Sequence, residues 1–227
     1  DKSALQSTTT AFECLTDDNI NLPSLKTAPS TTPSNIMADV NDKKLRKYRL
    51  AQSCTGEYGS IFKGTGTTAQ QKANVQAQMT ITMARVNGVY ERDLAITLEF
   101  IPNNDTLIYL LAASDPWTGE YNTKTAQTID ANVGINNYDI GHNFNTSGGG
   151  NAGCLSCVCQ GTLSSQAGTH KGRGMTGSSN PTGDPFDIDY VAHEMGHQFG
   201  GYHTMNTCSR SGNGQTEVEP CSGSSVM

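Results

Sequence analysis

The sequence lacks an apolar run of the roughly 18 residues that a membrane-spanning helix needs, so we expect no membrane span. Charged residues are sparse at 16%, and the formal net charge of −6 argues against a surface for nucleic acid or anionic membranes. No internal repeat or heptad pattern is visible, and Gly64-Thr-Gly66 is too short for a phosphate-binding loop. These absences leave one globular, loop-rich domain, with or without a tail.

Cysteine, by contrast, is plentiful, because seven residues are many for a cytosolic enzyme and common for a secreted one. An odd number leaves at least one thiol free or paired outside the chain. No signal-like apolar stretch follows Asp1, so we expect a secreted protein whose signal was removed or left out. Cys154-Leu-Ser-Cys-Val-Cys159 lacks the second matching pair of a metal site, which favours disulfides there. Cys208 and Cys221 flank one loop and are expected to bridge it.

Residues 1–43 are predicted to be a linker or a prosegment remnant. The stretch 27–35 is rich in Pro, Ser and Thr and has no apolar period. A polar run over 41–47 then leads into an apolar segment. The folded domain is therefore expected to start near Lys44.

Apolar periodicity beyond this point predicts a mixed α/β domain. Apolar residues recur at helical spacing over 68–87, which predicts a helix that stops at Gly88. Strict alternation over 94–100 predicts a half-buried strand. Further strands are expected at 48–53, 107–111 and 138–144, a helix at 123–133, and a flexible bend at 148–150.

A second amphipathic helix is predicted from Asp184 to Gly200. Asp184 is a good N-cap, Pro185 a good first helical residue, and Gly200 suits the left-handed turn that ends a helix. One apolar stripe is formed by Ile188, Val191, Ala192, Met195 and Phe199. The aspartates at 184, 187 and 189 are candidate ligands for Ca²⁺. Their spacing fits helix capping and a solvated face better.

The same helix carries the strongest functional signal. His193 and His197 are one helical turn apart, so both imidazoles project from one face and can share one Zn²⁺. A turn at Gly200 would bring His203 back as a third ligand. Three protein ligands with one open position are typical of a catalytic zinc rather than a structural one. Glu194 beside the first ligand would be the general base, whereas a purely structural zinc has no need of it.

The segment His-Glu-x-x-His-x-x-Gly-x-x-His from His193 to His203 resembles the signature of the metzincin zinc metallopeptidases. Residues 219–227 resemble the methionine turn of that family, with Met227 as its methionine. The phrasing over 187–200 is most similar to the bacterial secreted reprolysin-like group. The sequence departs from reprolysins at Thr204, where they carry Asp, and it stops at Met227, where metzincins continue.

The resemblance implies an α/β (α+β) catalytic domain: a mixed twisted sheet with a long backing helix and a zinc-binding active-site helix. Residues 44–200 would form the upper subdomain. Residues 201–227 would begin a truncated lower subdomain that ends at the methionine turn, and a separate C-terminal fragment of the same precursor is an expected partner. By the order of elements, Tyr138–Asn145 would be the edge strand that binds substrate, with Asp139, Ile140, Gly141 and His142 as candidate contacts.

Cys14 would, by the same resemblance, be a latency thiolate that blocks the zinc. His142 is expected not to be a ligand, since three suffice, and His170 is expected to be solvated in a polar loop. The implied activity is a secreted zinc endopeptidase that hydrolyses peptide bonds of proteins or peptides through a zinc-bound water, with Glu194 as general base. Two alternatives remain: a non-catalytic, zinc-stabilised binding or adhesion module, and a zinc hydrolase acting on something other than peptides, such as an amidase.

Overall fold

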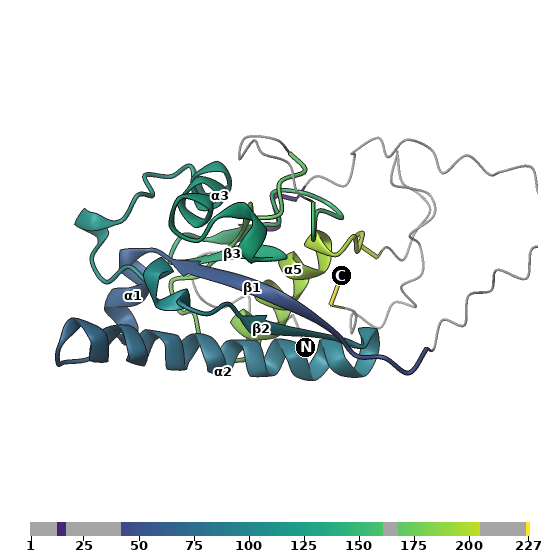
Figure 1. The fold of residues 1–227 in the computed structure, drawn as a ribbon, viewed down its shortest axis with the longest axis horizontal. Coiled ribbons are helices and arrows are strands. Elements are labelled where there is room, and N and C mark those ends of the chain that lie inside the picture. Colours follow the sequence, from purple (N-terminus) through teal and green to yellow (C-terminus); the bar gives the residue numbers. More distant parts are fainter. Residues whose placement is uncertain (1–12, 17–41, 161–167, 205–225) are drawn as a thin grey trace, which may run out of the picture.

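The computed structural model describes residues 13–16, 42–160, 168–204 and 226–227. Its centre is a sheet of five strands in the order β2-β1-β3-β5-β4 (Figure 1). All neighbouring strands are parallel except β4, which pairs antiparallel with β5. The strands are β1 Arg46–Cys54, β2 Ile96–Phe100, β3 Ile140–Asn145, β4 Gly149–Asn151 and β5 Gly174–Gly177. The predicted mixed α/β fold is confirmed.

Helices cover both faces of this sheet. The long helix α2 (Thr68–Leu94) runs along one face with α1 (Gly56–Phe62) near its start, and α3 (Tyr121–Asn132) lies on the other face (Figure 1). Neighbouring residues of β1 point to opposite layers, since Leu50 joins the core beneath α2 and Ala51 joins the core beneath α3. In the described part of the chain, every helix is too short or too polar to cross a membrane.

Helix α2 confirms the predicted apolar stripe but not its end. Val75, Met79, Met83 and Val86 are all buried, while the helix passes through Gly88 and continues to Leu94. Tyr90 extends the stripe by one turn and is buried, which outweighs the roughly 1 kcal/mol that a helical glycine costs. Ala95 then ends the helix in the left-handed conformation, with φ 53°.

Three other predicted elements need correction. The segment 107–111 is not a strand, because Leu107 closes a 3-10 helix (Asn104–Leu107) and only Ile108 bridges to β1. The glycine run at 148–150 is not merely a bend, because its last two residues belong to β4 at the edge of the sheet. The strand predicted at 138–144 exists as β3, but it lies between β1 and β5.

The helix that carries the histidines is a composite of α4 (Asp184–Phe186), a π-helical turn (Asp187–Ala192) and α5 (His193–Gln198). The predicted N-cap is wrong, since Gly183 occupies that position and Asp184 forms an ion pair with Arg85 of α2 instead. Short 3-10 helices also occur at Ala112–Ser114 and Ile135–Asn137. Val191, Ala192 and Met195 are buried against α2, as the stripe predicts.

Candidate active site

Three histidines converge at α5, since His193 and His197 lie on this helix and His203 follows it. The Nε2 atoms of His193, His197 and His203 lie 3.2 Å from one another in all three pairings. Gly200, with φ 102°, forms the turn that brings His203 back toward the helix. The structure therefore brings together the three residues that the sequence singled out as zinc ligands.

The outer nitrogens of two of these rings fix their tautomer. His193 Nδ1 is 2.6 Å from the Val226 carbonyl, and His197 Nδ1 is 2.7 Å from the Gly201 carbonyl. Because a carbonyl only accepts, both Nδ1 atoms carry the proton and both Nε2 atoms present lone pairs. Their 3.2 Å contact joins two acceptors, which a cation between them makes favourable.

The donor set fits tetrahedral zinc. Three nitrogens at Zn–N distances near 2.0–2.1 Å would lie about 3.3 Å apart, close to the 3.2 Å separation in this structure. The carbonyls on Nδ1 are the usual outer partners of zinc-binding histidines. Among the described residues, the group able to hold a metal ion consists of these histidines and Cys14.

Glu194 lies on α5, here called the zinc helix, and its side chain is fully buried against the edge of the sheet. A methyl group on Gly150 of β4 would lie 2.5 Å from both Cγ and Oε1 of Glu194, so only glycine leaves room for this carboxylate. The Thr16 hydroxyl donates a hydrogen bond of 2.9 Å to Glu194 Oε2. The predicted base thus lies directly against the backbone of an edge strand.

Residues 13–16 lie along that edge strand and cross the site. The Leu15 N–H donates to the Gly150 carbonyl at 2.8 Å, and the Gly150 N–H donates to the Glu13 carbonyl at 3.0 Å. Cys14 bridges to Gly150 in the parallel direction. Its Sγ lies 3.6 Å from His197 Nε2, which equals the separation of about 3.6 Å expected for sulfur and nitrogen on one zinc ion. Burial and the Glu194 charge raise the pKa of this thiol to about 12, so a thiolate here needs a cation.

Met227 packs beneath the histidines, where the family resemblance expects a methionine. A methyl group on Gly196 would lie 2.8 Å from Met227 Sδ, and one on Gly201 would lie 3.4 Å from it. The Thr204 hydroxyl also donates to the Met227 carbonyl. The remainder of the predicted methionine turn, 219–225, lies outside the described residues.

The predicted substrate strand is wrong. Asp139 precedes β3, whereas Ile140, Gly141 and His142 belong to it, and β3 is paired on both sides in the middle of the sheet. Its backbone pairs with β1 on one side and β5 on the other, so β3 is not available as an edge for a substrate. The edge strand next to Glu194 is β4. It was not predicted from the sequence, because three consecutive glycines carry no strand pattern.

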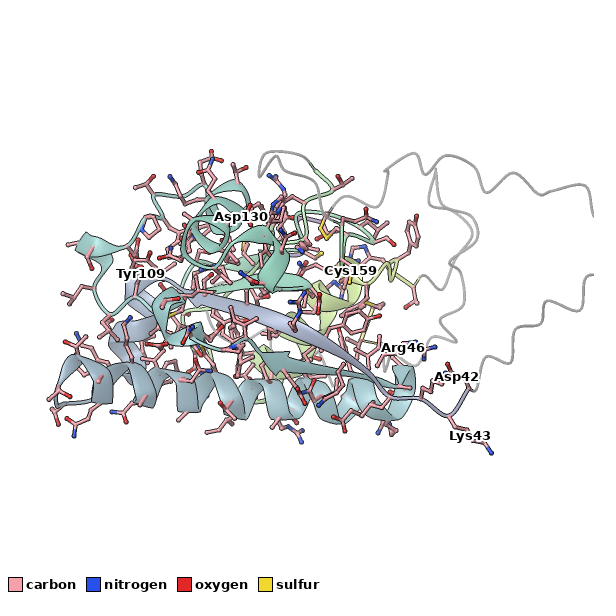
Figure 2. The ribbon with its side chains drawn as sticks, viewed as in Figure 1. Asp42, Lys43, Arg46, Tyr109, Asp130 and Cys159 are labelled. Atoms are coloured by element: carbon pink, nitrogen blue, oxygen red, sulfur yellow. A yellow bond between two sulfur atoms is a disulfide. The ribbon has the colours of Figure 1, made fainter. Side chains whose placement is uncertain are left out.

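Two further predictions about polar residues need correction. His170 is not solvated, because it is fully buried and its Nε2 lies 3.0 Å from Asp130 of α3, which Figure 2 labels. The aspartates considered for Ca²⁺ do not form a metal cluster within the described ranges. Asp187 is buried rather than on a solvated face.

The described cysteines outside the site divide into one bridge and two free thiols. Cys154 and Cys157 form a disulfide, as favoured from the sequence, while Cys54 is buried and Cys159, labelled in Figure 2, is exposed. The pair expected at Cys208 and Cys221 lies outside the described residues.

Comparison with known proteins supports the geometry. A family model for metallo-peptidase family M12B, reprolysin-like, matches residues 44–227. No curated protein matches the sequence. The family match spans the sheet, α2 and the histidine cluster, and so covers well over half of the chain. The chain therefore belongs to the reprolysin-like metallopeptidases of family M12B.

Proposed function

We propose that this chain is a secreted, zinc-dependent endopeptidase of the bacterial reprolysin-like group, with Glu194 as general base. The observation that carries the proposal is the convergence of three histidine Nε2 atoms beside a buried glutamate and an edge strand. Metallopeptidases of this family depend on zinc and cleave proteins or peptides. The disulfide between Cys154 and Cys157 supports an oxidising compartment.

His193, His197 and His203 would hold the ion. Zinc, when bound, supplies Lewis-acid chemistry, since it acidifies water and polarises a carbonyl. Glu194 would take a proton from the attacking water and pass it to the leaving amine. The backbone of β4 would align an extended peptide across the site, because an edge strand offers unpaired N–H and C=O groups to a partner chain.

Residues 13–16 would act as an inhibitory segment of the same chain. They already occupy the backbone groups of Gly150, bring the Cys14 sulfur into the group of atoms that would hold the metal and cover Glu194 with the Thr16 hydroxyl. A substrate needs all three places. These contacts support a latent enzyme, which would become active when this segment leaves.

The cysteine at the fourth position also favours a second candidate function. A site closed by three histidines and one cysteine has the pattern of a structural zinc, as expected for a non-catalytic binding module. The two candidates differ in activity once residues 13–16 are removed. Only the peptidase would then cleave a protein substrate, and only its cleavage would depend on the Glu194 carboxylate.

Glu194→Ala tests the proposal. We expect the chain without residues 13–16, assayed on casein with and without a metal chelator, to lose cleavage at least about 100-fold in the variant, since loss of a proton-transferring group typically costs about 10²–10⁴-fold. Zinc content should stay near one equivalent, because no ligand changes. Cleavage at the wild-type rate by the variant would refute the mechanism, and absence of cleavage by the wild type without residues 13–16 would favour the binding module.

A further inference from the structure

The side chain of Gln198 anchors the last turn of the zinc helix to the sheet. Gln198 directly follows the ligand His197 and is fully buried. Its Nε2 donates to the Gly141 carbonyl at 3.1 Å, and its Oε1 lies 2.8 Å from Nδ1 of His142. One side chain thus joins α5 to β3 through both ends of its amide.

The hydrogen bonds of this amide determine the proton position on His142. Because Nε2 of Gln198 faces a carbonyl, its Oε1 must accept, and His142 must donate from Nδ1. His142 Nε2 then accepts from the Thr176 hydroxyl of β5 at 2.8 Å. A methyl group on Gly174 would lie 2.3 Å from both His142 Nδ1 and Gln198 Oε1, so the chain keeps a glycine where the two side chains meet.

Other contacts at the end of α5 hold it less specifically. The His197 and Gln198 carbonyls accept main-chain hydrogen bonds from Ser156, Cys157 and Val158. These bonds cap the helix end, but they are made by a loop. The Gln198 amide instead reaches two neighbouring residues of a central strand, which is paired on both sides. Rotation of α5 about its axis would break both contacts.

We propose that His142 and Gln198 form a positioning pair that sets the rotation of α5 and thereby the direction of the His193 and His197 imidazoles toward the metal. Neither residue belongs to the group of side chains able to hold the metal. Metal ligands must be held within about 0.5 Å and 10–20° of their working geometry, and residues behind the ligands typically change metal affinity or activity by 10–100-fold. The effect on cleavage rests on the proposed peptidase function, whereas the effect on zinc affinity does not.

His142→Asn and His142→Leu are a matched pair for the test. The two side chains have nearly the same size, and both lose the contact with Thr176. Only Asn has an N–H that can replace Nδ1–H toward Gln198. In the full chain, we expect zinc affinity, measured by competition with a chromophoric chelator, to stay within about threefold of wild type for Asn. We expect it to fall about 10–100-fold for Leu.

A spectrum separates positioning from mere stability. The visible absorption of the cobalt-substituted chain reports ligand geometry, and we expect it to change in His142→Leu but not in His142→Asn. Ser53→Ala is the stability control, because its hydroxyl donates to the His142 carbonyl without contacting Gln198. Equal zinc affinities for the Asn and Leu variants would overturn the proposal. So would a Ser53→Ala variant that loses as much zinc affinity as His142→Leu for the same loss of melting temperature.

Gly174→Ala replaces His142→Leu in this test if the latter does not fold. Its methyl group would push His142 and Gln198 apart while both polar side chains remain. We expect a zinc affinity at least about tenfold below that of Ser53→Ala. Equal affinities in these two variants would also overturn the proposal. If the wild-type chain binds zinc but cleaves nothing after removal of residues 13–16, the peptidase function fails while the affinity measurements still decide the positioning role.

Discussion

Glycine at position 150 explains how the Glu194 carboxylate, the predicted general base, can lie so close to the edge strand β4. The sequence motif identified Glu194, because His-Glu-x-x-His places a carboxylate beside a ligand wherever it forms a helix. It did not identify Gly150, which is distant along the chain and carries no side chain. Its role is visible only as the 2.5 Å approach of an added methyl group to the Glu194 side chain.

Gly150→Ala should therefore impair catalysis without removing the metal. The methyl group would displace the Glu194 carboxylate, and misplacement of a reacting group by about 1 Å can cost 10²-fold in rate. We expect kcat for a peptide substrate to fall 10–100-fold, with zinc content unchanged. Gly148→Ala is the matched control, since a methyl group there meets nothing within 4 Å. Equal kcat values for the two variants would contradict this account.

At the scale of elements, strand β3 contributes a titrating group that is sealed in the sheet. Burial lowers the pKa of His142 from its ordinary value of 6.5 to about 4, and its nitrogens contact the neutral side chains of Gln198 and Thr176. Between these two pKa values the unfolded chain binds a proton that the folded chain does not. The stability that depends on neutral His142 is therefore fully present above pH 6.5 and is lost as the pH drops from 6.5 toward 4.

The expected slope from His142 is about 1.4 kcal/mol per pH unit across that window. Urea unfolding at pH 7, 6, 5 and 4 would measure it, with His142→Asn as the reference, because asparagine does not titrate and the metal ligands are common to both chains. The free energy of unfolding should fall more steeply for wild type than for the variant. Parallel pH profiles would show that His142 titrates normally in the folded chain.

Elements were predictable where local periodicity and burial agree. The stripe of α2 and the alternation in β2 each follow from residues that face one core, and both were found. The end of α2 was not, because the gain from burying Tyr90 beyond Gly88 depends on packing against the zinc helix. Sheet order was also out of reach, since the position of β3 in the middle depends on pairing between distant segments.

On the scale of the whole molecule, residues 13–16 and the candidate active site lie in direct contact, although they are distant along the chain. The family resemblance alone predicts that Cys14 is a latency thiolate. The structure adds three independent contacts of its segment: the Cys14 sulfur near His197, the Thr16 hydroxyl on Glu194 and backbone pairing with Gly150. In the proposed peptidase, each contact would block a different requirement of peptide hydrolysis.

Cys14→Ser should raise the activity of the full chain, because zinc binds a thiolate strongly and an alcohol weakly. The Thr16 and backbone contacts would remain, so we expect partial activation, at least about tenfold in the rate of cleavage of a quenched fluorescent peptide at saturating zinc. Cys159→Ser is the control, since this exposed thiol lies outside the metal cluster. Deleting residues 1–16 should activate further, because all three contacts are then lost. If Cys14→Ser and Cys159→Ser cleave at the same rate while the deletion is active, the sulfur is not the inhibitory ligand, and latency must come from the strand pairing and Thr16 alone.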